Sequence, residues 1–193
     1  MYTPVFNRWE DEAALRAFVA EVGSAWFVTS GPDGVPQATL LPIIWRDEVV
    51  VAHIAKANPH WREIVDGSPA LLIVGGPEAY ISPSLYAAKA EHGKVVPTWN
   101  YTAVHIAGAV TVRPDAGWLR SVVTELTDRH EGNRTEPWQV ADAPEDYIDG
   151  MLKAIVGLEI RVTSVEGKAK LSQNRPAADQ AAAAAVMAVG RHP

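Results

Sequence analysis

The sequence predicts an α+β fold, a mostly antiparallel β-barrel of six or seven strands with helices between the strands and at both ends. Three strands in succession near the N-terminus are joined by tight turns, which indicates an antiparallel meander. The helical segments do not alternate regularly with the strands, as they would in a parallel βαβ sheet. The chain has 193 residues, 48% of them hydrophobic, which fits one large domain with a single core.

The first predicted element is an amphipathic helix over residues 11–22, where apolar side chains recur every three or four residues. The segments that follow are short, rich in β-branched or aromatic residues, and separated by turn signals such as Gly31-Pro32-Asp33-Gly34. We therefore predict three strands: Ser24–Ser30, Val35–Arg46 and Val49–Ala55.

In the middle of the chain, Asn58-Pro59 predicts a short helix that ends near Asp66. Asparagine caps free amides, and proline is preorganised for the first helical position. Three more strands are expected over Pro69–Val74, Ala79–Ser82 and Trp99–Arg113. Residues 83–97 mix charged and small side chains, which indicates a long loop over a site.

The last third of the chain is expected to hold two helices, a strand and a tail. Asp115 predicts the cap of a helix that ends near His130, and Asp142 with Glu145 predicts the start of the next. The last clear strand is Ile155–Val165. Alanine-rich residues from Pro176 onward favour helix. The predicted organisation is one domain over residues 1–175 and a helical tail over 176–193.

Composition and missing motifs exclude several function classes. Without cysteine, the chain has no disulfide, thiolate metal site or thiol nucleophile. The formal net charge of −6 disfavours direct DNA binding, although a local basic patch remains an alternative. Rossmann, P-loop, zincin and α/β-hydrolase motifs are missing, and the six histidines show no helical metal-ligand pairing. The N-terminus has no signal-peptide pattern, so a cytoplasmic location is expected.

The segment from His53 to Arg62 is the most informative, because it carries a strand directly into a capped helix. Free amides at a helix N-terminus bind phosphate, and Lys56, His60 and Arg62 add donors around that end. The alternative is an ordinary capped helix with solvated basic residues and Trp61 as a core plug.

Three further segments have the composition of a ligand site. In the strand from Gln37, Pro42 indicates an edge or a bulge that exposes backbone polar groups to a flat heterocycle, or simply an edge strand. Residues 80–101 concentrate aromatic, hydroxyl and amide groups suited to a ring system, or form a structural loop. The polar residues 166–175 either cover a ligand or form a solvated exit loop.

Taken together, these segments resemble the PaiB-type family of FMN-binding negative transcriptional regulators, related in fold to the pyridoxamine-phosphate-oxidase split barrel. The resemblance covers nearly the whole chain and rests on several sequence motifs that occur in the same order as in the family. They are Met1-Tyr2-Thr3-Pro4, Ala57-Asn58-Pro59-His60-Trp61, Tyr80-Ile81-Ser82-Pro83-Ser84, Lys89-Ala90-Glu91-His92-Gly93, Val96-Pro97-Thr98-Trp99-Asn100-Tyr101, Pro144-Glu145-Asp146 and Lys170-Leu171-Ser172-Gln173-Asn174-Arg175. Gly75-Gly76-Pro77 and the alanine-rich tail depart from the pattern.

The resemblance implies an FMN-binding split β-barrel that forms a homodimer, with a flavin in each of two clefts between subunits. It implies that the phosphate lies near Lys56, Asn58, His60 and Trp61. It places the flavin ring near Thr39, Leu40, Leu41 and Pro42. Further contacts are expected from Ser82, Ser84, Trp99 and Asn100 of the same or the partner chain. No catalytic or metal-ligating residue is predicted.

The function implied by the resemblance is negative transcriptional regulation by a homodimeric flavoprotein. The acidic pI of 5.5 and the lack of a recognisable helix-turn-helix indicate that regulation is indirect or uses a small basic patch. One alternative is a flavin-dependent oxidoreductase or flavin reductase, because the cofactor itself carries hydride or electron chemistry. A third is a split barrel that has lost its flavin and serves as an interaction module.

Overall fold

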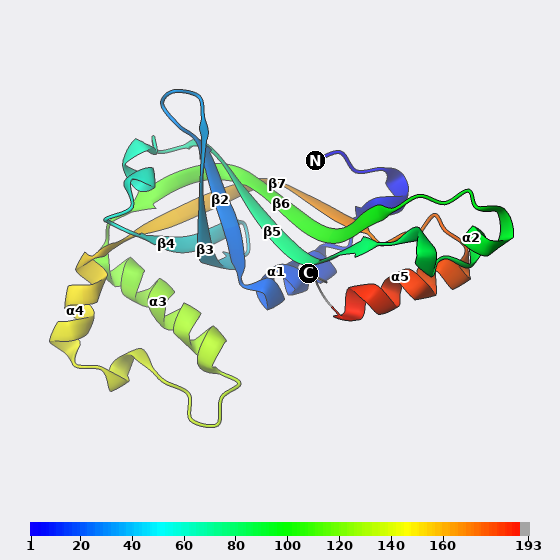
Figure 1. Ribbon diagram of the computed structural model, residues 1–193. Helices are drawn as coiled ribbons and strands as arrows, with labels where there is room; N and C mark the ends of the chain where they lie inside the picture. Colours follow the sequence, from blue (N-terminus) through cyan, green and yellow to red (C-terminus); the bar gives the residue numbers. More distant parts are fainter. Residues whose placement is uncertain (190–193) are drawn as a thin grey trace. The chain divides into compact units, whose positions relative to one another are not determined.

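The computed structural model describes residues 1–189, which form seven strands, five α-helices and four short 3-10 helices (Figure 1). The strands are β1 Arg8–Trp9, β2 Ser24–Ser30, β3 Pro36–Arg46, β4 Val49–Ala55, β5 Ser68–Ile81, β6 Thr98–Arg113 and β7 Ile155–Lys170. The α-helices are α1 Glu12–Val22, α2 Ala87–His92, α3 Ala116–Glu131, α4 Glu145–Lys153 and α5 Ala177–Val189. The 3-10 helices are η1 Val5–Asn7, η2 Pro59–Glu63, η3 Pro83–Leu85 and η4 Val140–Asp142.

The chain forms two compact units, each assembled from separate stretches of sequence. The first, the barrel unit, consists of Val19–Ile73 and Ile106–Val165. The second, the terminal unit, consists of Met1–Phe18, Val74–His105 and the residues from Glu166 onward. Strands β5, β6 and β7 each contribute residues to both units.

The strands of the barrel unit close into an antiparallel ring. The hydrogen-bonded order β7-β4-β3-β2-β5-β6 returns to its start because β6 also pairs with β7 (Figure 1). β3 pairs with β2 up to Ser24↔Pro42 and then with β4 from Ile43↔Ala52, so its first seven residues are paired on one side only. The edge indicated by Pro42 is therefore present locally, although β3 lies inside the sheet. A proline is tolerated there because its missing N–H interrupts no ladder on the open side.

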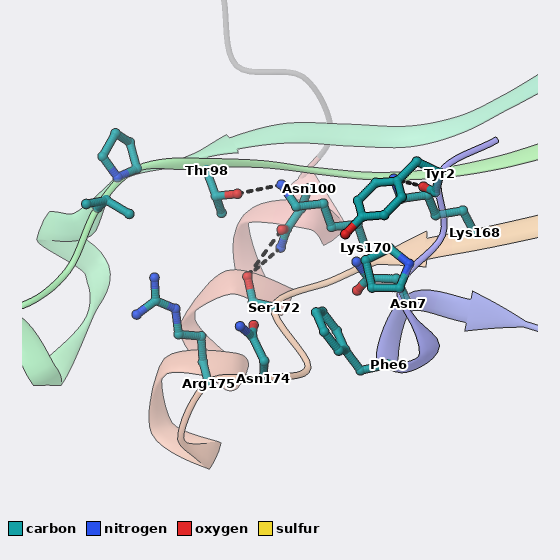
Figure 2. Close-up of a pocket in the computed structure, with 13 residues that line it drawn as sticks. Tyr2, Phe6, Asn7, Thr98, Asn100, Lys168, Lys170, Ser172, Asn174 and Arg175 are labelled. Atoms are coloured by element: carbon teal, nitrogen blue, oxygen red, sulfur yellow. Dashed lines mark hydrogen bonds between the residues drawn. The ribbon is translucent and has the colours of Figure 1, made fainter.

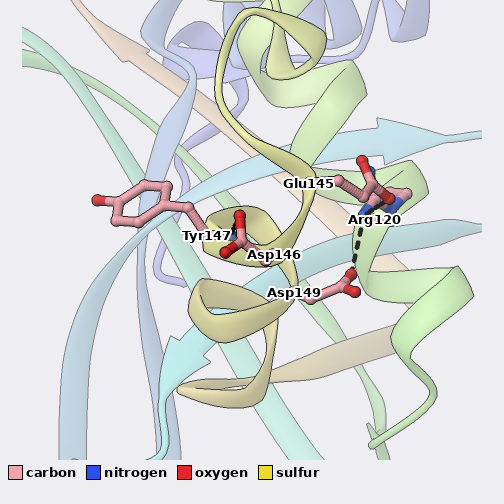
Figure 3. A network of polar contacts seen from close by, with 5 residues as sticks. All are labelled: Arg120, Glu145, Asp146, Tyr147 and Asp149. Carbon is pink, nitrogen blue, oxygen red and sulfur yellow. Dashed lines mark hydrogen bonds and ion pairs between the residues drawn. The ribbon is translucent and has the colours of Figure 1, made fainter.

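Two helices cover one part of the barrel unit. α3 packs Val122 and Leu126 against Ile44 and Val51 of the ring. Its cap is the predicted one: the side chain of Asp115 accepts from the amide of Trp118 at 2.7 Å. α4 joins α3 through a second apolar cluster and through a surface network. In that network, the Arg120 guanidinium on α3 donates to Glu145 and Asp149 on α4 (Figure 3).

Two features hold the terminal unit together, and both join segments that are far apart in the sequence. β1 pairs with the end of β7 through Arg8↔Lys168 and Trp9↔Gly167. The tail forms the expected helix, α5, which packs Ala183 against Ile81 and Tyr86. Residues 190–193 of the predicted tail lie outside the described residues.

Several predicted boundaries were wrong. β5 is one strand from Ser68 to Ile81 rather than two, because Gly76 allows close packing instead of a break: a Cβ there would lie 2.2 Å from the Thr102 Oγ1. β7 runs to Lys170, five residues beyond the predicted end, because the unpredicted β1 pairs with it. The expected loop 83–97 contains η3 and α2. The expected helix after Asn58 is the five-residue η2.

Within residues 1–189, no helix combines the length and the apolar character that a membrane crossing requires.

Candidate functional site

The centre of the candidate site is His60, a buried histidine in the barrel unit. Its side chain is 3% exposed, and its ring lies 5.0 Å from that of Phe27. The two ring nitrogens lie 2.9 Å from the hydroxyls of Thr29 on β2 and Thr39 on β3. His60 therefore links two neighbouring strands to η2.

Burial lowers the pKa of His60, and the charge of Glu63 opposes that shift only in part. The neutral imidazole offers one N–H donor and one acceptor nitrogen, and a hydroxyl can serve either of them. One threonine therefore donates to the ring and the other accepts from it. With both nitrogens occupied, His60 serves to position the turn around it rather than to offer a free nitrogen to a ligand.

Asn58 adds a second link between the same segments. Its side-chain oxygen accepts from the His60 amide at 3.0 Å, which caps η2 as the sequence predicted. Its side-chain nitrogen donates to the Thr39 hydroxyl at 3.3 Å. The turn between β4 and η2 is thus tied to β3 through a single amide side chain.

This turn carries exposed cations. The Lys56 carbonyl accepts from the Trp61 indole nitrogen at 3.1 Å and from the Arg62 guanidinium at 3.3 Å. Arg62 also lies over the Trp61 ring, 5.6 Å from its centroid. No hydrogen-bond or ion-pair partner of the Lys56 ammonium occurs in the part of the chain that the structure describes. A rigid backbone with two exposed cations is a donor set suited to an oxyanion such as phosphate.

The four β3 residues predicted near the flavin ring divide between the two faces of the strand. Thr39 and Leu41 point inward, the first toward His60 and the second into the core at 5% exposure. Leu40 and Pro42 point outward, and Leu40 lies opposite the exposed Trp26 of β2. Only one pair of side chains can therefore face any one ligand.

The four remaining predicted residues all belong to the terminal unit. Ser82 caps η3 by accepting from the Ser84 amide at 3.2 Å, and the Ser84 hydroxyl accepts from Lys89 at 3.0 Å. The exposed Trp99 donates its indole N–H to Glu78 at 3.0 Å. Asn100 is fully buried. Their predicted contact with a flavin remains a prediction.

Asn100 belongs to the floor of a cavity of about 290 Å³ within the terminal unit (Figure 2). Its side chain pairs with that of Ser172 through contacts of 3.0 and 3.2 Å. The cavity is also lined by Lys168, Lys170 and Arg175, from the segment that the sequence indicated as a ligand cover or an exit loop.

The structure thus brings Thr39, Lys56, Asn58, His60 and Trp61 together. Their expected contact with the phosphate and the ring of a flavin stays a prediction. Sequence reasoning missed Thr29, the second partner of His60, because 31 residues separate them and no local pattern connects them. It also missed the N-terminal wall of the cavity, formed in part by Tyr2 and Phe6.

Comparison with protein families gives a match over residues 1–164 to the family described as "Putative FMN-binding domain". The match spans all but the last residue of the barrel unit and more than half of the terminal unit's chain. It includes every residue predicted from the sequence to contact the cofactor.

Two curated relatives are similar in sequence. The chain is 32% identical over 183 residues to protease synthase and sporulation protein PAI 2 of Bacillus subtilis, covering 93% of this chain and 85% of the relative. It is 34% identical over 160 residues to an uncharacterized protein of Aspergillus fumigatus, covering 66% of this chain. It spans 61% of the length of that fungal relative.

Among solved structures, the FAD and heme binding protein from Mycobacterium smegmatis matches with a TM-score of 0.66 at 17% identity. The match covers 92% of this chain and 80% of that one. At such low identity the likeness concerns the fold alone. With the closed antiparallel ring, it confirms the predicted α+β split-barrel class.

Proposed function

The chain belongs to the PaiB-type family of FMN-binding domains, and from that membership we propose that it binds FMN and acts as a homodimeric negative regulator of gene expression. The observation that carries the flavin part is the turn after β4. There, exposed Lys56 and Arg62 stand on a backbone held to the barrel by Asn58 and His60.

The donor chemistry of this turn fits the phosphate of FMN. Lys56 and Arg62 supply positive charge. The Trp61 indole holds the Lys56 carbonyl, which also accepts from Arg62, in place. η2 has only five residues, and Asn58 already occupies the His60 amide. Side chains rather than helix amides therefore supply the phosphate contacts. Leu40 and Pro42 offer an apolar surface for the ring, and the bound flavin would supply electron or hydride chemistry.

The homodimer is supported by an apolar face on the outside of β2, β3 and β5 in the barrel unit. Trp26 is 50% exposed and Leu40 is 54% exposed, and they lie directly opposite each other. The register places further apolar residues on the same face: Val28, Ala38, Pro42, Leu71 and Ile73. A contiguous exposed apolar patch on a sheet is typical of a protein interface.

The regulatory part rests on the name of the Bacillus relative, a protease synthase and sporulation protein. The net charge of −6 works against a direct complex with DNA, so we propose that the dimer regulates indirectly or through a small basic patch. A tight, salt-sensitive complex with one promoter would contradict indirect action.

The flavin proposal is tested by titrating cofactor-stripped protein with FMN and with riboflavin, followed by flavin fluorescence. We expect FMN to bind more tightly, because riboflavin lacks the phosphate. Lys56→Gln should weaken the affinity for FMN by about tenfold, since one charge-assisted contact is lost, and should leave the affinity for riboflavin unchanged. Lys153→Gln, at the exposed end of α4, is the matched control. Equal affinities for both flavins would refute the phosphate site.

The dimer is tested separately by light scattering coupled to size-exclusion chromatography. Leu40→Glu places a charge in the centre of the apolar face and should give a monomer. Val35→Glu changes an apolar residue of the same hairpin that is 60% exposed, outside that face, and should leave the dimer intact. A dimer that survives Leu40→Glu would place the interface elsewhere.

A further inference from the structure

The cavity of the terminal unit gathers positive charge on its floor. Lys168 is only 8% exposed, and its ammonium donates to the Tyr2 carbonyl at 2.9 Å and lies 5.1 Å from the centre of the Tyr101 ring. Lys170 donates to the Thr98 hydroxyl at 2.6 Å (Figure 2). Both lysines thus point into the interior of the unit, where the groups that accept their hydrogen bonds are uncharged.

A third cation, Arg175, lies over the ring of Tyr86 at 5.1 Å. Among residues 1–189, none of the three cations forms an ion pair with a carboxylate. Glu166, the acid next along β7, is instead paired with the N-terminal amine. Half-buried positive charge without a counter-charge is unfavourable, so the floor of the cavity is electrostatically suited to an anion.

The polar floor also carries backbone strain. Ser172, 6% exposed, has a positive φ of 66°, which a residue with a Cβ rarely adopts. Its side chain is held there by the fully buried Asn100. Strained residues that their surroundings hold in place are concentrated at ligand clamps. The pair therefore gives an observation independent of the charges that also indicates a binding site.

The rim of the cavity is apolar and exposed. It includes the exposed side chains of Tyr2, Phe6 and Val96. A ring bound between them would cover this surface while its charged group reached the floor. The volume of about 290 Å³ lies near the lower end of ligand pockets, which suits a single ring with one charged substituent.

We propose that this cavity is a binding site for a small organic oxyanion, a phosphate or carboxylate attached to one ring, and that it is distinct from the proposed phosphate site at Lys56 and Arg62 in the turn after β4. Lys170 and Arg175 bind the oxyanion. Tyr2 and Phe6 contact the ring. The proposal does not depend on FMN binding.

The test is calorimetric titration of the wild-type protein with phenyl phosphate, benzoate, inorganic phosphate and benzylamine. Phenyl phosphate or benzoate should bind, inorganic phosphate more weakly, and the cationic benzylamine not at all. The stronger of the first two identifies the charged group. Lys170→Gln and Arg175→Gln should each weaken that binding about tenfold, and Lys170→Arg should restore most of it.

Lys89→Gln is the matched control, because Lys89 also donates to a hydroxyl in the same unit but lies outside the cavity. Circular dichroism and thermal melting show whether each variant is folded. Unchanged binding in both folded pocket variants, equal binding of benzylamine, or no binding of either anion by the wild type would overturn the proposal. Displacement of phenyl phosphate by FMN would overturn the separate site, whereas FMN that binds alongside it supports two sites.

Discussion

The sharpest prediction concerns His60→Phe. Phenylalanine keeps a ring of similar size beside Phe27 and removes both ring nitrogens. The hydroxyls of Thr29 and Thr39, each 2.9 Å from one nitrogen, then lose that partner. A lost hydrogen bond in a partly buried site costs about 1 kcal/mol, so the variant should lose roughly 2 kcal/mol of unfolding free energy.

The assay is urea unfolding followed by tryptophan fluorescence, carried out near pH 8 so that histidines are neutral in both states. Adding Thr29→Val removes one of the hydroxyls left without its partner. The double variant should therefore lose less unfolding free energy than the sum of the losses in the two single variants. His92→Phe, at the exposed end of α2 in the terminal unit, removes only the exposed hydrogen bond that its ring accepts from the Lys94 amide, and it should change stability by less than about 0.5 kcal/mol. A cost for His60→Phe as small as this control, or strict additivity with Thr29→Val, would refute the positioning role of His60.

Three further predictions concern the barrel unit and use unfolding free energy as the readout. Gly157→Ala should cost roughly 1–3 kcal/mol, because its Cβ would lie 2.2 Å from the Trp118 ring; Trp118→Phe should reduce that cost. Asp115→Ala should cost about 1 kcal/mol by removing the α3 cap, whereas Asp115→Asn should keep most of the stability that the cap provides. Burial lowers the pKa of His53 and His60 from the ordinary value of 6.5, so the unfolded chain binds protons more readily below that pH. Stability should therefore fall below about pH 6.5, by at most about 1.4 kcal/mol per pH unit for each histidine, and a flat profile between about pH 5 and 7 would contradict this.

Elements whose signals are local were predicted well. β2 and β4 have the predicted bounds, because turn residues mark their ends. Asp115 and Asn58 were identified as caps because each acts within three residues along the chain. Local sequence is sufficient where the partner groups are close in the chain.

Elements that depend on distant contacts were missed. Gly76 follows a second glycine and precedes a proline, a pattern that indicates a break, yet it lies within β5 because Thr102 and Phe18 leave no room for a side chain. The end of β7 is polar enough to suggest a loop, but Arg8 pairs with Lys168 across 160 positions of sequence. The residue pattern within either segment does not predict these distant contacts.

The candidate flavin site shows the same division within a few residues. Lys56 and Arg62 are exposed donors, and their kind and spacing could be read from the sequence. The groups that hold them come from three segments, since Thr29, Thr39 and Asn58 converge only when the barrel has formed. A substitution among the holding groups should therefore reduce stability and FMN affinity together. Replacing an exposed donor such as Lys56 should reduce affinity alone, because its side chain supports no other described residue.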